Sequence, residues 1–348
     1  MRINALNTRA AEAPRAHLAH VLPTLEVSGC LSMATTLMHD LKNQYAHTLL
    51  FDSDLTSTDK YCLLYAQSCG AQVLHADHIT PEVMDSCGFT GAVLYNVTER
   101  QGIGAVLPSI YYSHGIYDAN IVPDLVVTSS DYATRHDRFG NELNLDPAWV
   151  IPPFMQTRSM RRVRGPRRPF TVGIFTSGYM GKYPAEFVMQ MMHLLPDDVG
   201  LMINTMSEYR HPGAELAIKD RNDRVGKRML PVPIMPSMAI RYLIGVDALV
   251  YACAPGHYDP YARLVVEAMA FGKAVICERR GAPAELLEHG VNALLFDTPE
   301  EAVDHVQRIQ TDTKAREMLG VNAQLWASWQ DSSAHIGQFK RALRMIGA

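Results

Sequence analysis

The sequence predicts an α/β protein built from parallel sheets and divided into two domains. In residues 247–296, short apolar runs alternate with helical segments, which is the pattern of strand–helix–strand units. Similar strand-sized apolar runs recur along most of the chain. A length of 348 residues is enough for two domains of ordinary size, each with its own hydrophobic core.

The composition is that of a water-soluble folded chain, with 47% hydrophobic residues and a formal net charge of −4. No run of roughly 18 or more apolar residues occurs, so a transmembrane helix is not expected. Residues 1–16 are polar and lack the apolar core of a signal peptide, which favours the cytoplasm, with peripheral membrane association as an alternative. The 6 cysteines lack Cys-x-x-Cys spacing, so we expect reduced core thiols.

In the first half of the chain, short apolar runs separated by loops and helical segments predict a nucleotide-binding type of domain. The predicted strands are 17–22, 48–51, 72–75, 92–95 and 109–112, and the predicted helix is 30–41. The loop after the first strand ends in Ser28 and Gly29, and a glycine there lets the backbone approach a ligand closely.

The second half repeats this pattern. Its predicted strands are 170–176, 200–204, 228–231, 248–252, 274–277 and 293–296, and its predicted helices are 235–244, 299–310 and 313–319. Between the halves lies an arginine cluster, formed by Arg158, Arg161, Arg162, Arg164, Arg167 and Arg168. Such a segment is typical of a solvated hinge, and attraction of a phosphate-bearing acceptor is the alternative.

The helix that follows the strand at 248–252 begins with an arrangement suited to an anion. We expect Asp259 to cap its N-terminus and Pro260 to occupy the first helical position, where a missing N–H costs nothing. A helix N-terminus after a parallel strand attracts phosphate. Glu267 follows eight residues later, about 12 Å along a helix. Two carboxylates so placed are able to bracket a nucleoside diphosphate sugar, because each accepts hydroxyl hydrogen bonds.

This stretch resembles the signature of the retaining glycosyltransferases of the two-Rossmann (GT-B) fold, the family of sucrose synthase and the phosphatidylinositol mannosyltransferases. That signature is a Glu-x7-Glu pair followed by Ala-Met-Ala-x-Gly-x-Pro-Val, then Gly-Gly-x-x-Glu and an Asn-Gly-Leu-Leu-like strand. Here it occurs as Asp259, then EAMAFGKAVI at 267–276, GAPAE at 281–285 and NALL at 292–295. The first acid is Asp rather than Glu, and Pro260 and Ala262 replace glycines.

The resemblance implies a role for each residue of a donor site. Asp259 would hold the sugar hydroxyls, Glu267 the ribose, and Lys182 with Arg263 the diphosphate. His114, at the carboxyl end of a strand, would contact the sugar or the acceptor. The other expected donor-binding residues are Ser177, Gly178, Tyr261 and Ala262, and the expected acceptor-side loop contains Ser28 and Gly29.

The implied activity is transfer of a sugar from a UDP- or GDP-linked donor to an acceptor hydroxyl with retention, without a metal or any other cofactor. In this front-face reaction a donor phosphate oxygen takes the proton, and the protein positions the reactants and stabilises charge. The implied division is a Rossmann-like acceptor domain at 1–155, an arginine-rich linker at 156–169, a Rossmann-like donor domain at 170–330, and a terminal helix at 331–348 that packs on the first domain. The resemblance also implies a strand at 125–128 followed by a helix at 129–139, and terminal helices over 326–346. The two domains would face each other across a cleft.

Several alternatives remain open from the residues alone. The acceptor is a glycan, a lipid carrier, a small molecule or a hydroxymethylated base in DNA, and the arginine cluster favours the last. A non-catalytic sugar-nucleotide-binding scaffold is favoured by the shortened first acid and the missing glycines. Asp52 and Asp54 form an Asp-x-Asp pair after a strand, a pattern that is able to hold a divalent metal ion. Ser53 equally suits the N-cap of a helix, and we expect no metal.

Overall fold

The computed structural model describes residues 16–22, 29–51, 64, 66–75, 87–96, 107–113, 122–145, 148–162, 170–176, 181–205, 219–221, 223, 229–233 and 239–348. The predictions for Ser28, 52–54, His114, Ser177 and Gly178 lie outside these residues. Five cysteines in the described part are free, as expected: Cys30, Cys69, Cys87, Cys253 and Cys277.

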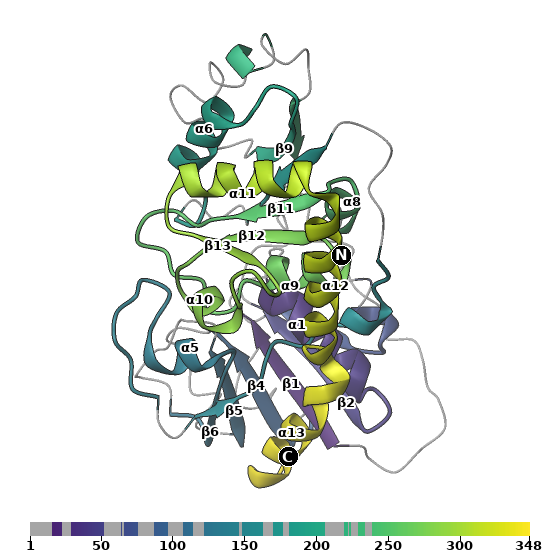
Figure 1. Ribbon diagram of the computed structural model, residues 1–348. Helices are drawn as coiled ribbons and strands as arrows, with labels where there is room; N and C mark the ends of the chain where they lie inside the picture. The colour runs from purple at the N-terminus through teal and green to yellow at the C-terminus, as the bar shows by residue number, and fades with distance from the viewer. Residues whose placement is uncertain are drawn as a thin grey trace.

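Two parallel sheets form the centres of the molecule, one in its lower part and one in its upper part in Figure 1. The first sheet has the strand order β3-β2-β1-β4-β5-β6-β7, and the second has the order β10-β9-β8-β11-β12-β13. Each order starts from a central strand, extends outward on one side, and then returns to extend on the other, which is doubly wound topology. The predicted α/β class with two parallel sheets is therefore confirmed.

The described strands are β1 (Ala16–Leu22), β2 (Tyr45–Phe51), β3 (Gln72–His75), β4 (Gly91–Tyr95), β5 (Ser109–Ser113), β6 (Leu125–Thr128), β7 (Trp149–Val150), β8 (Thr171–Ile174), β9 (Gly200–Thr205), β10 (Met229–Pro233), β11 (Ala248–Tyr251), β12 (Ala274–Glu278) and β13 (Leu294–Phe296). Central strands such as β4 and β11 are buried along their whole length. Helices cover both faces of a parallel sheet, so its strands are continuously apolar and recognisable in the sequence.

The described α-helices are α1 (Gly29–Leu41), α5 (Asp131–Arg135), α6 (Ala185–Leu194), α8 (Ala239–Ile244), α9 (Arg263–Ala270), α10 (Ala282–Leu286), α11 (Pro299–Thr311), α12 (Thr313–Trp329) and α13 (Ser332–Met345), with a 3₁₀ turn, η3 (Thr157–Ser159). Short polar side chains cap the N-termini of several helices. The Thr298 hydroxyl accepts the Glu301 N–H before α11, and the Asp312 carboxylate accepts the Ala315 N–H before α12.

Two helices differ from the sequence prediction. The helix expected over 129–139 covers only Asp131–Arg135, and the helix expected to stop at residue 319 continues to Trp329. Gly320, in the middle of α12, permits a close approach, because a Cβ there would lie 2.3 Å from the carbonyl oxygen of Gly272. The buried Ala323 and Ala327 continue the apolar face beyond it.

The last two helices connect the two sheets. In Figure 1, α12 descends beside the upper sheet and α13 continues to the lower one. Trp326 and Ala327 of α12 pack in the core around β11 and β12, whereas Phe339 and Leu343 of α13 are buried with the first sheet. The exact division of the chain at residues 155, 169 and 330 stays a prediction. None of the described helices combines the length and the apolar character that a membrane crossing requires.

A row of polar side chains crosses the buried interior of the first sheet. The Nδ1 atom of His20 on β1 lies 2.9 Å from the Tyr95 hydroxyl oxygen on β4, and its Nε2 atom lies 3.0 Å from Nδ1 of His47 on β2. Burial holds the pKa of His20 well below its ordinary value, and His47 lowers it further. Burial also lowers the pKa of His47 to about 4. Both imidazoles are therefore neutral near pH 7.

We expect the free energy of unfolding to fall as the pH falls from 6.5 toward 4. The folded protein keeps both imidazoles neutral in this window, whereas the unfolded chain binds a proton at each. One such histidine contributes at most about 1.4 kcal/mol per pH unit. Urea unfolding across this range should show a shallower pH dependence for His47→Gln than for the native chain. A slope for His47→Gln equal to that of the native chain would contradict the assignment.

Candidate functional site

The candidate site lies where the strand order of the second sheet reverses. The adjacent strands β8 and β11 run in parallel, and their following segments leave the sheet at the same edge. Ligands of doubly wound proteins bind in this position. Lys182 follows β8 and Asp259 follows β11, and the Ala254 N–H donates to the Lys182 carbonyl oxygen at 3.0 Å. The topology therefore brings together two of the predicted site residues that are distant in sequence.

The Asp259 carboxylate is buried and accepts four hydrogen bonds. Its Oδ2 atom accepts from the Lys182 ammonium at 2.5 Å and from the Tyr251 hydroxyl. Its Oδ1 atom accepts from the backbone N–H groups of Tyr261 at 3.1 Å and Ala262 at 2.9 Å. A carboxylate offers about four acceptor positions. All of them are filled in this arrangement.

These contacts set the charges of the pair. Burial alone would raise the pKa of Asp259, but the Lys182 charge and the hydrogen bonds to the carboxylate hold it well below its usual range. Burial alone would lower the pKa of Lys182, and the Asp259 carboxylate outweighs that effect and raises it. Both groups are therefore ionised near neutral pH. Removal of one partner would leave an uncompensated charge in the interior.

The predicted start of the helix after β11 is wrong. Pro260 does not occupy the first helical position, since α9 begins at Arg263 and Ala262 precedes it in the left-handed conformation, with φ +46°. Asp259 binds the N–H groups of that turn but lies too early to be the cap residue itself. A left-handed residue interrupts the helical path, and for a residue with a Cβ this conformation is strained.

Glu267 and Arg263 form an ion pair on α9, with Arg263 Nε 2.8 Å from Glu267 Oε1. They lie one helical turn apart, and both are mostly buried. Arg263 also acts electrostatically on Cys30 at the start of α1, where burial raises the pKa of the thiol to about 12 and the guanidinium opposes that shift. This side of α9 therefore faces the first domain, beside Gly29, which precedes Cys30.

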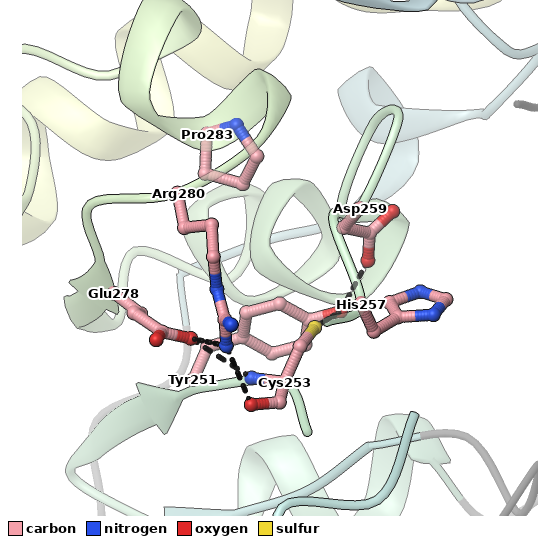
Figure 2. Close-up of a pocket in the computed structure, with 7 residues that line it drawn as sticks. All are labelled: Tyr251, Cys253, His257, Asp259, Glu278, Arg280 and Pro283. Atoms are coloured by element: carbon pink, nitrogen blue, oxygen red, sulfur yellow. Dashed lines mark hydrogen bonds and ion pairs between the residues drawn. The ribbon is translucent and has the colours of Figure 1, made fainter. Parts of the chain in front are cut away.

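A small pocket opens beside Asp259 at the carboxyl end of β11 and β12. Figure 2 shows the residues that line it: Tyr251, Cys253, His257, Asp259, Glu278, Arg280 and Pro283. Only Asp259 among them was predicted from the sequence. Arg280 donates to Glu278 and to the carbonyl oxygen of Cys253, each at 2.7 Å. Glu278 ends β12, so its place at a strand terminus is the signal that sequence reasoning overlooked.

His257 is a polar residue of this pocket with unused hydrogen-bonding capacity. Its side chain is buried, and no described group pairs with its Nδ1 atom, as is also true of the Arg280 Nε atom. Burial lowers the pKa of His257 to about 4, and the nearby charges of Lys182, Arg138 and Arg280 favour the neutral ring. A neutral imidazole offers one donor and one acceptor. A ligand hydroxyl or phosphate oxygen would satisfy it.

A glycine on the neighbouring segment shapes the backbone at Asp259. Gly281 has φ +66°, and a Cβ there would lie 2.8 Å from both the backbone N and O atoms of Asp259. The adjacent Ala282 N–H donates to the Asp259 carbonyl oxygen at 2.9 Å. Only glycine accommodates this conformation and this approach together. The glycine in the GAPAE segment therefore supports the loop that carries the carboxylate.

The first domain holds the same loop from the other side. The Ser130 hydroxyl donates to the Pro260 carbonyl oxygen at 2.7 Å, and the Tyr258 N–H donates to the Arg138 carbonyl oxygen at 2.8 Å. Arg135 forms an ion pair with Glu285 at 2.7 Å. Asp259 and its neighbours are thus fixed between the two domains.

Comparisons with known proteins concern the family and the fold. A family model described as glycosyl transferases group 1 matches residues 246–326, which include the Asp259 loop, α9 and the GAPAE segment. Over 74 residues the chain is 31% identical to spore coat protein SA of Bacillus subtilis (strain 168), and this match spans 20% of each protein. The matched region thus covers about a fifth of that relative's length.

Solved structures match over nearly the whole chain. Anabaena HepE, crystallised with UDP and glucose, has a TM-score of 0.74 at 15% identity, covering 95% of this chain and 100% of that one. Sucrose-phosphate synthase from Thermosynechococcus elongatus has a TM-score of 0.71 at 13% identity, covering 95% and 99%. Similarity at such identities concerns the fold. The predicted two-Rossmann GT-B architecture is confirmed.

The left-handed conformation of Ala262 makes a testable prediction. Ala262→Gly and Ala268→Gly each remove one buried methyl group and loosen the unfolded chain similarly, but only the first relieves backbone strain. Ala262→Gly should therefore leave the protein about 1–2 kcal/mol more stable than Ala268→Gly. Urea unfolding of the two variants measures this difference. Equal stabilities would show that Ala262 is not strained.

Proposed function

We propose that this protein is a glycosyltransferase that transfers a sugar from a nucleoside diphosphate sugar to an acceptor hydroxyl with retention of configuration. The observation that carries the proposal is the Lys182–Asp259 pair at the strand-order reversal, directly before α9 with Glu267. Ligands bind at this place in doubly wound folds. The match of residues 246–326 to the group 1 model and the UDP complexes of HepE support the same donor class.

Each charged residue has a place in this proposal. Lys182 binds the donor diphosphate, Glu267 accepts the ribose hydroxyls, and Asp259 orients the transferred sugar. All four acceptor positions of Asp259 are filled, so it reaches a sugar hydroxyl only when one partner leaves. The diphosphate draws the Lys182 ammonium away and frees Oδ2 for the sugar. Donor binding then replaces the contact between Lys182 and Asp259 by two new contacts, one between Lys182 and the diphosphate and one between Asp259 and the sugar.

A single ammonium does not balance a departing diphosphate. Arg263 is paired with Glu267 and Arg280 with Glu278, and Arg280 and Arg138 both act at His257, so we assign the additional positive charge to the neighbourhood of His257. These groups would stabilise the leaving diphosphate in a site of low dielectric. The enclosed cavity has a volume of about 10 Å³, far less than the roughly 300–1,000 Å³ of typical ligand sites. A donor therefore fits here only when the lining side chains move.

The proposed chemistry is a front-face displacement without a metal. The bond from the anomeric carbon to the diphosphate oxygen breaks as the acceptor oxygen attacks the same face, and a donor phosphate oxygen takes the acceptor proton. Burial raises the pKa values of Cys30 and Cys253 to about 12, so neither thiol is a nucleophile near pH 7. The protein contributes position and charge. Proton NMR of the product anomer and activity after EDTA treatment test retention and metal independence.

The donor is identified by thermal shift against a panel of UDP- and GDP-sugars. A donor supplied at a concentration of about 100 times its dissociation constant should stabilise the protein by about 2.7 kcal/mol. Glu267→Ala should abolish this shift, because the ribose loses its acceptor. Glu317→Ala, which removes an exposed carboxylate from α12, should retain it.

Release of nucleoside diphosphate distinguishes an enzyme from a binding scaffold. Release of nucleoside diphosphate with a sugar-bearing product supports the enzyme, whereas a shift without any release supports a binding scaffold. No shift from any donor would contradict both.

A paired substitution separates the structural role of Lys182 from its role in binding. Lys182→Met should cost about 3–5 kcal/mol of stability, because the buried Asp259 carboxylate loses its partner. Lys182→Met combined with Asp259→Asn removes both charges and should recover much of that loss. Urea unfolding measures stability, and isothermal titration with the donor measures binding. The double variant should still not bind the donor; binding at native strength would show that the pair serves only the fold.

A further inference from the structure

Tyr251 contacts both members of the Lys182–Asp259 pair from the side of the sheet. It is the last residue of β11, and its hydroxyl donates a hydrogen bond to Oδ2 of Asp259. The centroid of its ring lies 5.7 Å from the Nζ atom of Lys182. Figure 2 shows the ring reaching from the strand toward the carboxylate. The phenol and the ammonium therefore share one oxygen atom of Asp259.

The Tyr251 hydroxyl acts as a donor toward Asp259. An ionised carboxylate only accepts hydrogen bonds, so the shared hydrogen belongs to the phenol. Burial, together with the charge of Asp259, raises the pKa of Tyr251 well above its ordinary value, so the phenol keeps this hydrogen near neutral pH. The Cys253 thiol donates to the phenol oxygen, with its Sγ atom 3.8 Å away. The single hydrogen of the phenol is thus committed to Asp259.

The phenol is held by the sheet, whereas the ammonium is carried by a flexible side chain. Tyr251 is buried, and its backbone lies opposite Cys277 of β12 in the parallel register. Its ring packs in the core that the second sheet shares with α9. Lys182 has a flexible four-carbon stem and lies between β8 and α6. Of these two donors to Oδ2, the ammonium is therefore the one that a diphosphate is able to draw away.

We propose that Tyr251 is a positioning residue, which keeps the Asp259 carboxylate turned toward the donor sugar after Lys182 has moved to the diphosphate. This inference rests on the proposed function, in which a sugar hydroxyl takes the place of the ammonium at Oδ2. The backbone N–H groups of Tyr261 and Ala262 hold only Oδ1. Among the described groups, Lys182 and Tyr251 are the donors to Oδ2. Without the phenol, the carboxylate of the loaded site would be free to turn about its Cβ–Cγ bond.

A purely structural role of the hydroxyl has a different consequence. A hydroxyl that only satisfies the buried pair acts in the free protein, so its loss would affect every ligand of the site alike. A positioning role acts only when Lys182 has left and a sugar is present. The contribution of the sugar to binding therefore distinguishes the two roles.

The test compares the binding of a nucleotide sugar with that of its nucleoside diphosphate. Isothermal titration with UDP-glucose and UDP, and with GDP-mannose and GDP, gives the ratio of the two dissociation constants in each pair. Tyr251→Phe should shift this ratio roughly tenfold against the sugar, which corresponds to one hydrogen bond to a charged group. The affinity for the diphosphate alone should change by less than about twofold, because Lys182 remains. Tyr45→Phe, which removes a hydroxyl from β2, is the matched control and should keep the native ratio.

A double-mutant cycle tests whether the phenol acts through Asp259. In Asp259→Ala the hydroxyl has no carboxylate to hold, so the addition of Tyr251→Phe should not change the ratio further. Thermal unfolding shows which variants are folded, and Tyr251→Phe alone decides if Asp259→Ala is not.

The outcomes for the native chain and for Tyr251→Phe are read separately. A native chain that binds neither pair of ligands contradicts the proposed function itself. If the native chain binds a donor, the inference on Tyr251 is overturned when Tyr251→Phe keeps the native ratio or weakens the sugar nucleotide and the diphosphate equally. It is also overturned when the loss in Tyr251→Phe adds to the loss in Asp259→Ala.

Discussion

The buried ion pair between Asp259 and Lys182 is the interaction on which the candidate site depends. It joins the segments after two adjacent strands, and the second oxygen of the same carboxylate binds the backbone just before α9. A charge in the interior is tolerated only when it is paired and hydrogen-bonded. The pair therefore fixes where Lys182, the Ala262 turn and Glu267 lie relative to one another, whatever ligand they bind.

The surrounding structure holds this loop on two sides. Gly281 allows one backbone to lie directly against another, and Ser130 of the first domain binds the Pro260 carbonyl oxygen. Because the contacts come from both domains, the geometry of the carboxylate reports how the domains sit together. The loop that carries Asp259 is thus held by residues of both domains.

Much of the fold could be predicted because buried parallel strands leave a continuous apolar signal, as at 248–252 and 274–277. The start of α9 could not be predicted, because the proline and the aspartate suggested a helix cap and nothing in the sequence reveals that Ala262 is left-handed. The pairing of Arg263 with Glu267, and the pocket around His257 and Arg280, depend on tertiary contacts. Likewise, the helix predicted to stop at residue 319 continues through Gly320, whose conformational cost is offset by close packing in α12.

The junction between α12 and α13 has a mechanical consequence. One helix belongs to the core of the second sheet and the other to the core of the first, so any rotation between the domains must be absorbed in the residues that join them. Gln330 lies at this joint and accepts a hydrogen bond from the Tyr261 hydroxyl at 2.9 Å. Tyr261 in turn donates its backbone N–H to Asp259. The joint between α12 and α13 and the Asp259 carboxylate are therefore linked through one residue, Tyr261, so a displacement of either one strains the other.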